Sequence, residues 1–150
     1  MDAMHDRLAG IECTFANDAR LIAGSAAVVA HIARRAGFHE RVQGDLATAA
    51  ISACCEIFLS ARALGHSAPI VRLSASHFPD RVEVFLEILK GGRRAPRRGA
   101  GLLQKAASQL TENIRKSFEG IPVDRVECDA PDGRPVVTLT KFRGGRRPAS

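Results

Sequence analysis

Three polar residues at four-residue spacing, Ser52, Glu56 and Ser60, interrupt the apolar run AISACCEIFLSARALGH. Side chains four residues apart lie on one face of a helix, so the spacing predicts one carboxylate between two hydroxyls. A carboxylate is a legitimate ligand for Mg²⁺. A serine hydroxyl accepts no proton near neutral pH, and no His/Asp arrangement accompanies Ser52, Ser60 or Ser74 to make a nucleophile. Glu56 is therefore the residue of this row with candidate chemistry of its own.

A glycine-rich basic segment, KGGRRAPRRGAG, provides a second candidate site. Backbone N–H groups at a helix start after Gly99 and Gly101 could hold an anion. The arginines beside them could bind an acidic protein surface or a nucleic acid, or could form a solvated loop. No aromatic residue lies among them, which disfavours base stacking. The anion- or partner-binding candidates are Arg93, Arg94, Arg97 and Arg98.

The cysteines show no metal-ligand spacing and no CxxC motif; they are Cys13, Cys54, Cys55 and Cys128. On a helix the adjacent Cys54 and Cys55 point about 100° apart, so they cannot form one edge of a zinc site. We expect the cysteines to be small buried hydrophobes, and no metal site is predicted. His31 is predicted at the surface, and His66 and His77 in loops.

Composition fits one ordinary globular domain: 150 residues, 45% hydrophobic and 25% charged, with a net charge of +6. No run approaches about 18 apolar residues, so no membrane span is expected. The start MDAMHDRLAGIE lacks the basic and apolar regions of a signal peptide. We therefore expect a cytoplasmic protein.

Hydrophobic periodicity predicts the order β-α-α-β-β-loop-α-β-β. Asn17 or Asp18 should cap the first helix, and Gly37 and Gly65 should end the first two. The order favours an α+β two-layer sandwich, a mixed and mostly antiparallel sheet covered on one face by about three helices. The expected strands are 11–16, 69–76, 81–89, 124–130 and 134–142, and the expected helices are 18–36, 41–64 and 99–117.

This order of elements, with four stretches of sequence, resembles the GHKL ATPase (Bergerat, histidine-kinase-like) fold. Within it, the chain is most similar to the small bacterial anti-sigma-factor serine kinases. The stretches are FANDARLIAGSAAVVAHIARRAGF, DLATAAISACCEIFLSA, RGAGLLQKAASQLTENI and PVVTLTKF. The resemblance implies a single domain at 11–142 with a lid-like basic loop at 90–98. An N-terminal extension, 1–10, would precede it and a basic flexible tail, 143–150, would follow.

The resemblance also implies roles for individual positions, and several depart from the family pattern. Ser52 stands where the family has its glutamate base, Glu56 where an asparagine holds magnesium, and Ser60 where a histidine is common. The adenine-binding aspartate falls on Leu89, followed by Gly91, or loosely on Glu87. The threonine near the last strand falls on Pro135. The implied nucleotide-binding positions, without a catalytic base, are Ser52, Glu56, Gly91, Gly99 and Gly101.

Three functions follow as hypotheses. The first is a regulatory protein that binds a partner, with ATP binding or turnover lost or weakened. The second is an active serine/threonine kinase and anti-sigma factor that uses Mg-ATP, with Glu56 as the metal ligand. The third is a basic nucleic-acid-binding module using the arginine loop and tail. The resemblance implies a sigma factor or an anti-sigma-factor antagonist as partner, and a homodimer.

Overall fold

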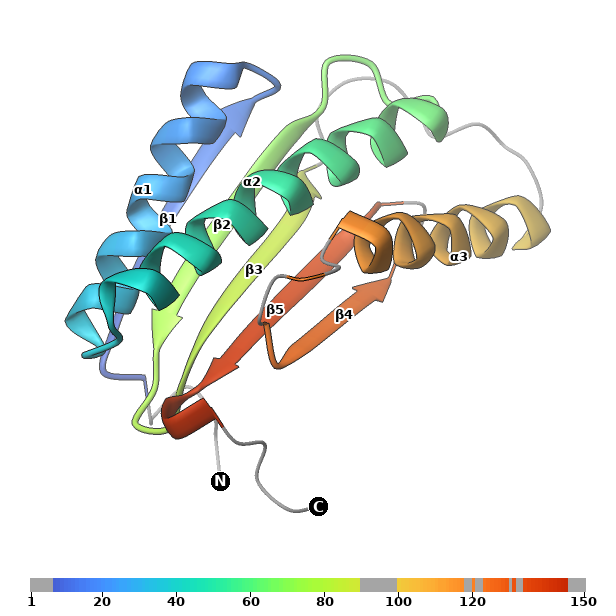
Figure 1. The fold of residues 1–150 in the computed structure, drawn as a ribbon. Helices are drawn as coiled ribbons and strands as arrows, with labels where there is room; N and C mark the ends of the chain where they lie inside the picture. The colour runs from blue at the N-terminus through green and yellow to red at the C-terminus, as the bar shows by residue number, and fades with distance from the viewer. Residues whose placement is uncertain are drawn as a thin grey trace.

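The computed structural model describes residues 7–89, 100–117, 120, 123–129, 131 and 134–145. The predicted order of helices and strands is confirmed (Figure 1). The elements are β1 (Ala9–Ala16), α1 (Ala19–Arg35), α2 (Glu40–Ala63), β2 (Ile70–His77), β3 (Arg81–Leu89), α3 (Ala100–Ser117), β4 (Arg125–Asp129) and β5 (Val136–Phe142).

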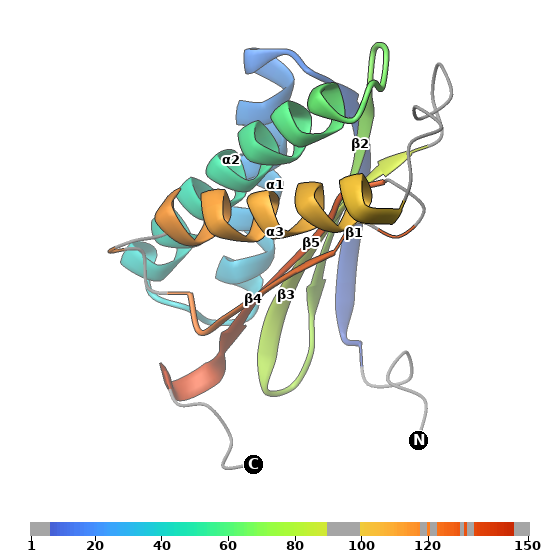
Figure 2. The same cartoon turned by 90° about the vertical axis from the view of Figure 1, so that its right-hand side faces the viewer.

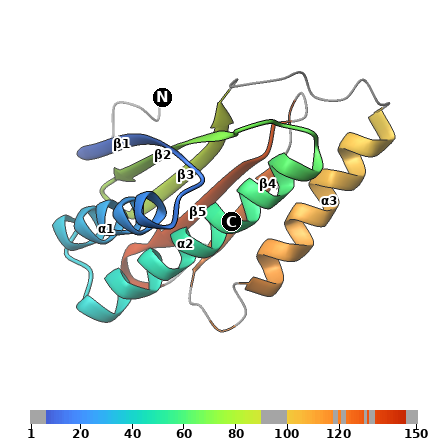
Figure 3. The same cartoon turned by 90° about the horizontal axis from the view of Figure 1, so that it is seen from above.

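The strands form one open sheet in the order β1-β2-β3-β5-β4, and every pairing described is antiparallel rather than mixed. Alternate residues of a strand point to opposite faces. In β3 the even-numbered residues from Val82 to Ile88 are buried, and the odd-numbered residues are half-buried. The helices lie on one face (Figure 3), so the predicted α+β two-layer sandwich is confirmed.

The core lies between the sheet and the helix layer. Phe15 of β1 and Phe58 of α2 meet edge to face, with ring centroids 6.2 Å apart. α3 packs beside α2 and over β4 (Figure 2). Burying side chains of this size stabilises the fold by about 1.5–3 kcal/mol each. The largest fully buried side chains include Ile32, Leu46, Ile57, Leu73, Leu86, Ile88, Leu110, Ile114 and Leu139.

Local sequence signals set the helix ends as expected. The Asp18 side chain accepts a hydrogen bond from the Arg20 backbone N–H at 2.8 Å, which caps α1. Gly37 and Gly65 follow α1 and α2 with φ of 86° and 87°, a left-handed conformation that favours glycine. His39 precedes α2 without a side-chain capping bond.

Several predicted boundaries are wrong by a few residues. β1 begins at Ala9, inside the predicted N-terminal extension, and the Leu8 N–H already bonds the His77 carbonyl at 2.8 Å. His77 is the last residue of β2 rather than a loop residue. β4 begins at Arg125 and β5 at Val136, later than the expected starts at 124 and 134, because pairing with the neighbouring strand begins only there.

Arg143, the first residue of the predicted flexible tail, lies in a short 3₁₀ turn at Arg143–Gly145. Its backbone N–H donates to the Asp80 carbonyl at 2.7 Å, and its Nη2 donates to the Ala36 carbonyl at 2.8 Å. The folded part of the chain therefore extends at least to Arg143. Residues 1–6 and 146–150 lie outside the described residues.

α2 is, among the described helices, the one long and apolar enough to cross a membrane by length and composition alone. It has 24 residues, and 44% of its most apolar window is buried inside the protein. Its buried side chains, such as Ala53 and Ile57, belong to the hydrophobic core. One face of α2 is therefore part of the hydrophobic core.

Candidate functional site between α2 and α3

The row predicted on α2 faces α3. Ser52, Glu56 and Ser60 are each half-buried, whereas Ala53 and Ile57 beside them are buried against the sheet. The Ser117 hydroxyl at the end of α3 donates to Glu56 Oε1 at 3.4 Å. One turn further along α2, Ser60 lines a pocket between the two helices.

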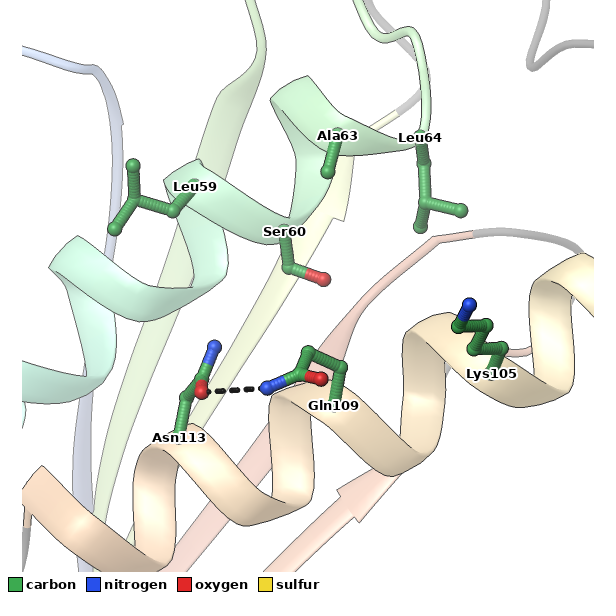
Figure 4. Close-up of a pocket in the computed structure, with 7 residues that line it drawn as sticks. All are labelled: Leu59, Ser60, Ala63, Leu64, Lys105, Gln109 and Asn113. Atoms are coloured by element: carbon green, nitrogen blue, oxygen red, sulfur yellow. Dashed lines mark hydrogen bonds between the residues drawn. The ribbon is translucent and has the colours of Figure 1, made fainter.

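This pocket has a volume of about 360 Å³ (Figure 4). Figure 4 shows an α2 wall above, with Ser60 pointing toward α3, and a row of longer polar side chains on α3 below. Gln109 Nε2 donates to Asn113 Oδ1 at 2.9 Å, which orients both amides. The described lining residues are Leu59, Ser60, Ala63, Leu64, Lys105, Gln109 and Asn113.

The pocket has an apolar wall and a polar wall, and the polar wall carries a positive charge. Leu59, Ala63 and Leu64 supply apolar surface from the last two turns of α2. On the α3 side, the Lys105 ammonium is the one charged group among the described lining residues. Such a surface suits a ligand or a partner side chain with an apolar body and an anionic or hydrogen-bonding end.

Sequence reasoning missed the α3 half of this site. Lys105, Gln109, Asn113 and Ser117 recur every four residues, the same spacing as the row on α2. The first three line the pocket, and the fourth contacts Glu56. The spacing alone did not single out this row, because Gln104, Ser108, Glu112 and Lys116 form another polar row at the same spacing.

The predicted residues are only partly brought together. Ser60 lines the pocket, but Ser52 and Glu56 are not among its lining residues. Gly101 is the second residue of α3 and lies in its first turn. The remaining predictions, which lie outside the described residues, concern Gly91, Arg93, Arg94, Arg97, Arg98 and Gly99.

The residues at the family's adenine-binding positions lie elsewhere. Glu87 is an odd-numbered residue of β3, on the sheet face away from the helices, and it forms an ion pair with Arg72 of β2. Leu89 ends β3 with the same orientation and is half-buried. Pro135 is buried, and its carbonyl accepts a hydrogen bond from the Ile88 N–H at 3.2 Å. Glu87 therefore does not face the α2–α3 pocket.

The cysteine prediction is wrong for one residue. Cys54 is buried, and Cys13 and Cys128 are half-buried against the core, but Cys55 is exposed. Burial, opposed by a hydrogen bond with Ser25, raises the pKa of Cys54 to about 12. Burial also raises the pKa of Cys13 and of Cys128. These three thiols are therefore poor nucleophiles at neutral pH.

Among the residues that the structure describes, the histidines and acids do not gather into a metal site. Within the described part of the chain, no group of three or more His, Cys, Asp or Glu could hold a metal ion. His31 is half-buried on α1, with its Nδ1 3.4 Å from Arg34 Nη2. Burial, with Arg143 and Arg35 nearby, lowers the pKa of His77.

No protein-family model matches the chain, and no curated protein matches it.

Proposed function

We propose that the protein is a cytoplasmic regulatory domain of the GHKL type, similar to the anti-sigma-factor serine kinases, that works by binding a protein partner. ATP turnover is lost in this proposal. The element order and the layer of helices on one face of the sheet support it. So does the pocket between α2 and α3, which carry two of the four stretches of the resemblance.

The chemistry of the pocket wall carries the proposal. Its described polar side chains are an ammonium (Lys105), two amides (Gln109 and Asn113) and a hydroxyl (Ser60). None of them takes a proton from a substrate hydroxyl near neutral pH. A protein kinase of this family would need a carboxylate base. Ser52, at the family's base position, is a hydroxyl and is not among the lining residues.

The residues present also fit magnesium poorly. Mg²⁺ prefers oxygen ligands, usually one or two carboxylates with substrate phosphates. Glu56 is the carboxylate of the α2 row. It accepts a hydrogen bond from Ser117 at 3.4 Å and is not among the described lining residues. Lys105 could attract an anion, but an ammonium repels a metal ion. We therefore assign no catalytic step to magnesium ATP.

Calorimetric titration with Mg-ATP and Mg-ADP tests this proposal. We expect binding weaker than a Kd of about 1 mM, equivalent to about −4 kcal/mol. A Lys105→Gln variant should lower any residual binding, while Lys116→Gln, an exposed α3 lysine that does not line the pocket, should leave it unchanged. Micromolar binding together with transfer of the γ-phosphate to a protein serine would overturn the proposal.

The same titration distinguishes the proposal from the kinase alternative, because an active kinase requires micromolar nucleotide binding. In that alternative the Glu56→Ala variant should also lose phosphate transfer. The nucleic-acid alternative rests on the arginines of the loop and tail, of which Arg143 alone is among the described residues. A sigma factor or an anti-sigma-factor antagonist, the partners implied by resemblance, would be the first proteins to test for binding.

A further inference from the structure

The α2–α3 pocket is a hollow that reaches down to the hydrophobic core. Leu59 at its rim is 58% exposed, although it is a large hydrophobic side chain. Leu64 also lines the pocket and is only 2% exposed. The volume of about 360 Å³ lies within the range of about 300–1,000 Å³ that is typical of small-molecule sites. The pocket therefore has the depth and the size to hold a small molecule.

The charge of the lining selects an anion. Lys105 carries an ammonium, and none of the other described lining residues is acidic. Glu56 is not among them, and its carboxylate accepts a hydrogen bond from Ser117. An anion is therefore attracted to the lining, whereas a cationic ligand meets a like charge. One ammonium balances one negative charge, so a monoanion fits the described lining better than a polyphosphate does.

The polar groups beside the ammonium suit a carboxylate. Lys105 and Gln109 are four residues apart, so they are neighbours on one face of α3. The bond to Asn113 uses one of the two hydrogens of the Gln109 amide, and the other can bond a ligand. Figure 4 shows the Ser60 hydroxyl pointing toward α3 from the opposite wall. The two oxygens of a carboxylate can accept one bond from the ammonium and others from uncharged donors.

We propose that the α2–α3 pocket binds a small amphipathic monoanion, a carboxylate with an unbranched apolar chain of medium length. The carboxylate pairs with Lys105, and the chain lies against Leu59, Ala63 and Leu64. The ligand thereby contacts both helices, so its binding stabilises the folded protein. This inference rests on the proposed function in one respect, because it requires a pocket in which no nucleotide competes.

Calorimetric titration with a matched set of small probes separates the head group from the chain. Octanoate carries both features, acetate has the head group alone, octanamide has the chain with a neutral head, and octylammonium has the chain with the opposite charge. We expect octanoate to bind with a Kd below about 1 mM and to raise the midpoint of thermal unfolding. Octanamide should bind at least about tenfold more weakly, because it lacks the charge that pairs with Lys105. Acetate and octylammonium should show no saturable binding.

Matched variants place the ligand in the pocket. Lys105→Gln should weaken octanoate binding at least about tenfold and leave octanamide binding unchanged. Lys116→Gln, at an exposed α3 position outside the lining, should change neither. Ala63→Phe fills the pocket from α2 and should abolish octanoate binding. Ala23→Phe makes the same change at an exposed position of α1 and should have no effect on binding. Circular dichroism confirms that each variant is folded.

Nuclear magnetic resonance tests the orientation of the bound ligand. We expect nuclear Overhauser effects between the terminal methyl group of octanoate and the methyl groups of Leu59 or Leu64. The Lys105 side-chain signals should shift during the same titration. A carboxylate that shifts no Lys105 signal would overturn the assigned pairing.

Titrations with octanoate and with Mg-ATP distinguish failure of this inference from failure of the proposed function. Absence of octanoate binding at about 10 mM, in a protein that also does not bind Mg-ATP, would overturn the inference alone. Octanoate binding that persists in both Lys105→Gln and Ala63→Phe would also overturn it, because the site would lie elsewhere. Micromolar Mg-ATP binding with phosphate transfer, beside Lys105-dependent octanoate binding, would overturn the proposed function and leave the octanoate site standing.

Discussion

Cys54 and Cys55 are neighbours in the chain but lie in opposite environments. The Cys54 side chain is fully buried between α1, α2 and the sheet, where Ser25 of α1 bonds it. Cys55 points to solvent from the same turn of α2. The angular offset of about 100° between successive helical residues is enough to separate a core position from a surface position.

We expect this difference to appear in thiol reactivity. A thiol with a pKa of about 12 is ionised to about one part in 10⁴ at pH 8, and burial also blocks the reagent. Iodoacetamide at pH 8 should therefore modify Cys55 quickly in the native protein and Cys54 only after unfolding. Mass spectrometry of the peptides measures both, and Cys55→Ser should lose the fast phase. Rapid native modification of Cys54 would contradict the buried position.

Asp124 acts at the scale of elements, because it joins the start of β4 to the end of β5. Its carboxylate accepts a hydrogen bond from the Phe142 N–H at 2.7 Å and lies 3.3 Å from the Lys141 ammonium. The Lys141 and Asp124 side chains are only 10% and 17% exposed. An ion pair this buried is costly to break, because removing one partner leaves the other charge without compensation.

We predict that Asp124→Ala lowers the free energy of unfolding by about 3 kcal/mol, as measured by urea denaturation. Asp124→Asn/Lys141→Met, which keeps an acceptor for the Phe142 N–H and removes both charges, should recover most of the loss. Glu127→Ala is the matched control. Its ion pair with Arg125 is more than half exposed on both sides, so its cost should be below about 1 kcal/mol. Equal losses in Asp124→Ala and Glu127→Ala would refute the argument.

Local sequence signals predicted the helices and strands better than they predicted which of these elements lie side by side. The Asp18 cap, the glycines with positive φ and the alternation in β3 each act within a few residues, and each placed its element correctly. Strand order is a long-range property. Nothing within β5 indicates that it inserts between β3 and β4. For the same reason the sequence indicated the polar row on α2, of which Ser60 lines the pocket, but neither the rest of the lining nor the partner row on α3.

At the scale of the whole molecule, one end brings together segments far apart in the chain. The C-terminus of α1, the β2–β3 connection and the residues after β5 meet there (Figure 1). Arg143 makes two of the contacts, one to Ala36 and one to Asp80. A guanidinium at a helix C-terminus also interacts favourably with the carbonyl dipoles. Composition alone placed Arg143 in a tail, because an arginine followed by glycines resembles a linker when its distant partners are unknown.

This contact gives the position of Arg143 a measurable consequence. A chain ending at Phe142 loses both hydrogen bonds, and we expect it to be less stable than a chain ending at Gly145 by about 1–2 kcal/mol. Full-length Arg143→Gln keeps the backbone bond to Asp80 and should lose about 1 kcal/mol. Urea denaturation of the three proteins beside wild type measures these differences. Because the two bonds tie the end of α1 and the β2–β3 connection to the residues after β5, the loss should appear as a shift of one cooperative transition. Equal stability of the chains ending at 142 and 145 would mean that the fold ends at β5 and that Arg143 contributes nothing to it.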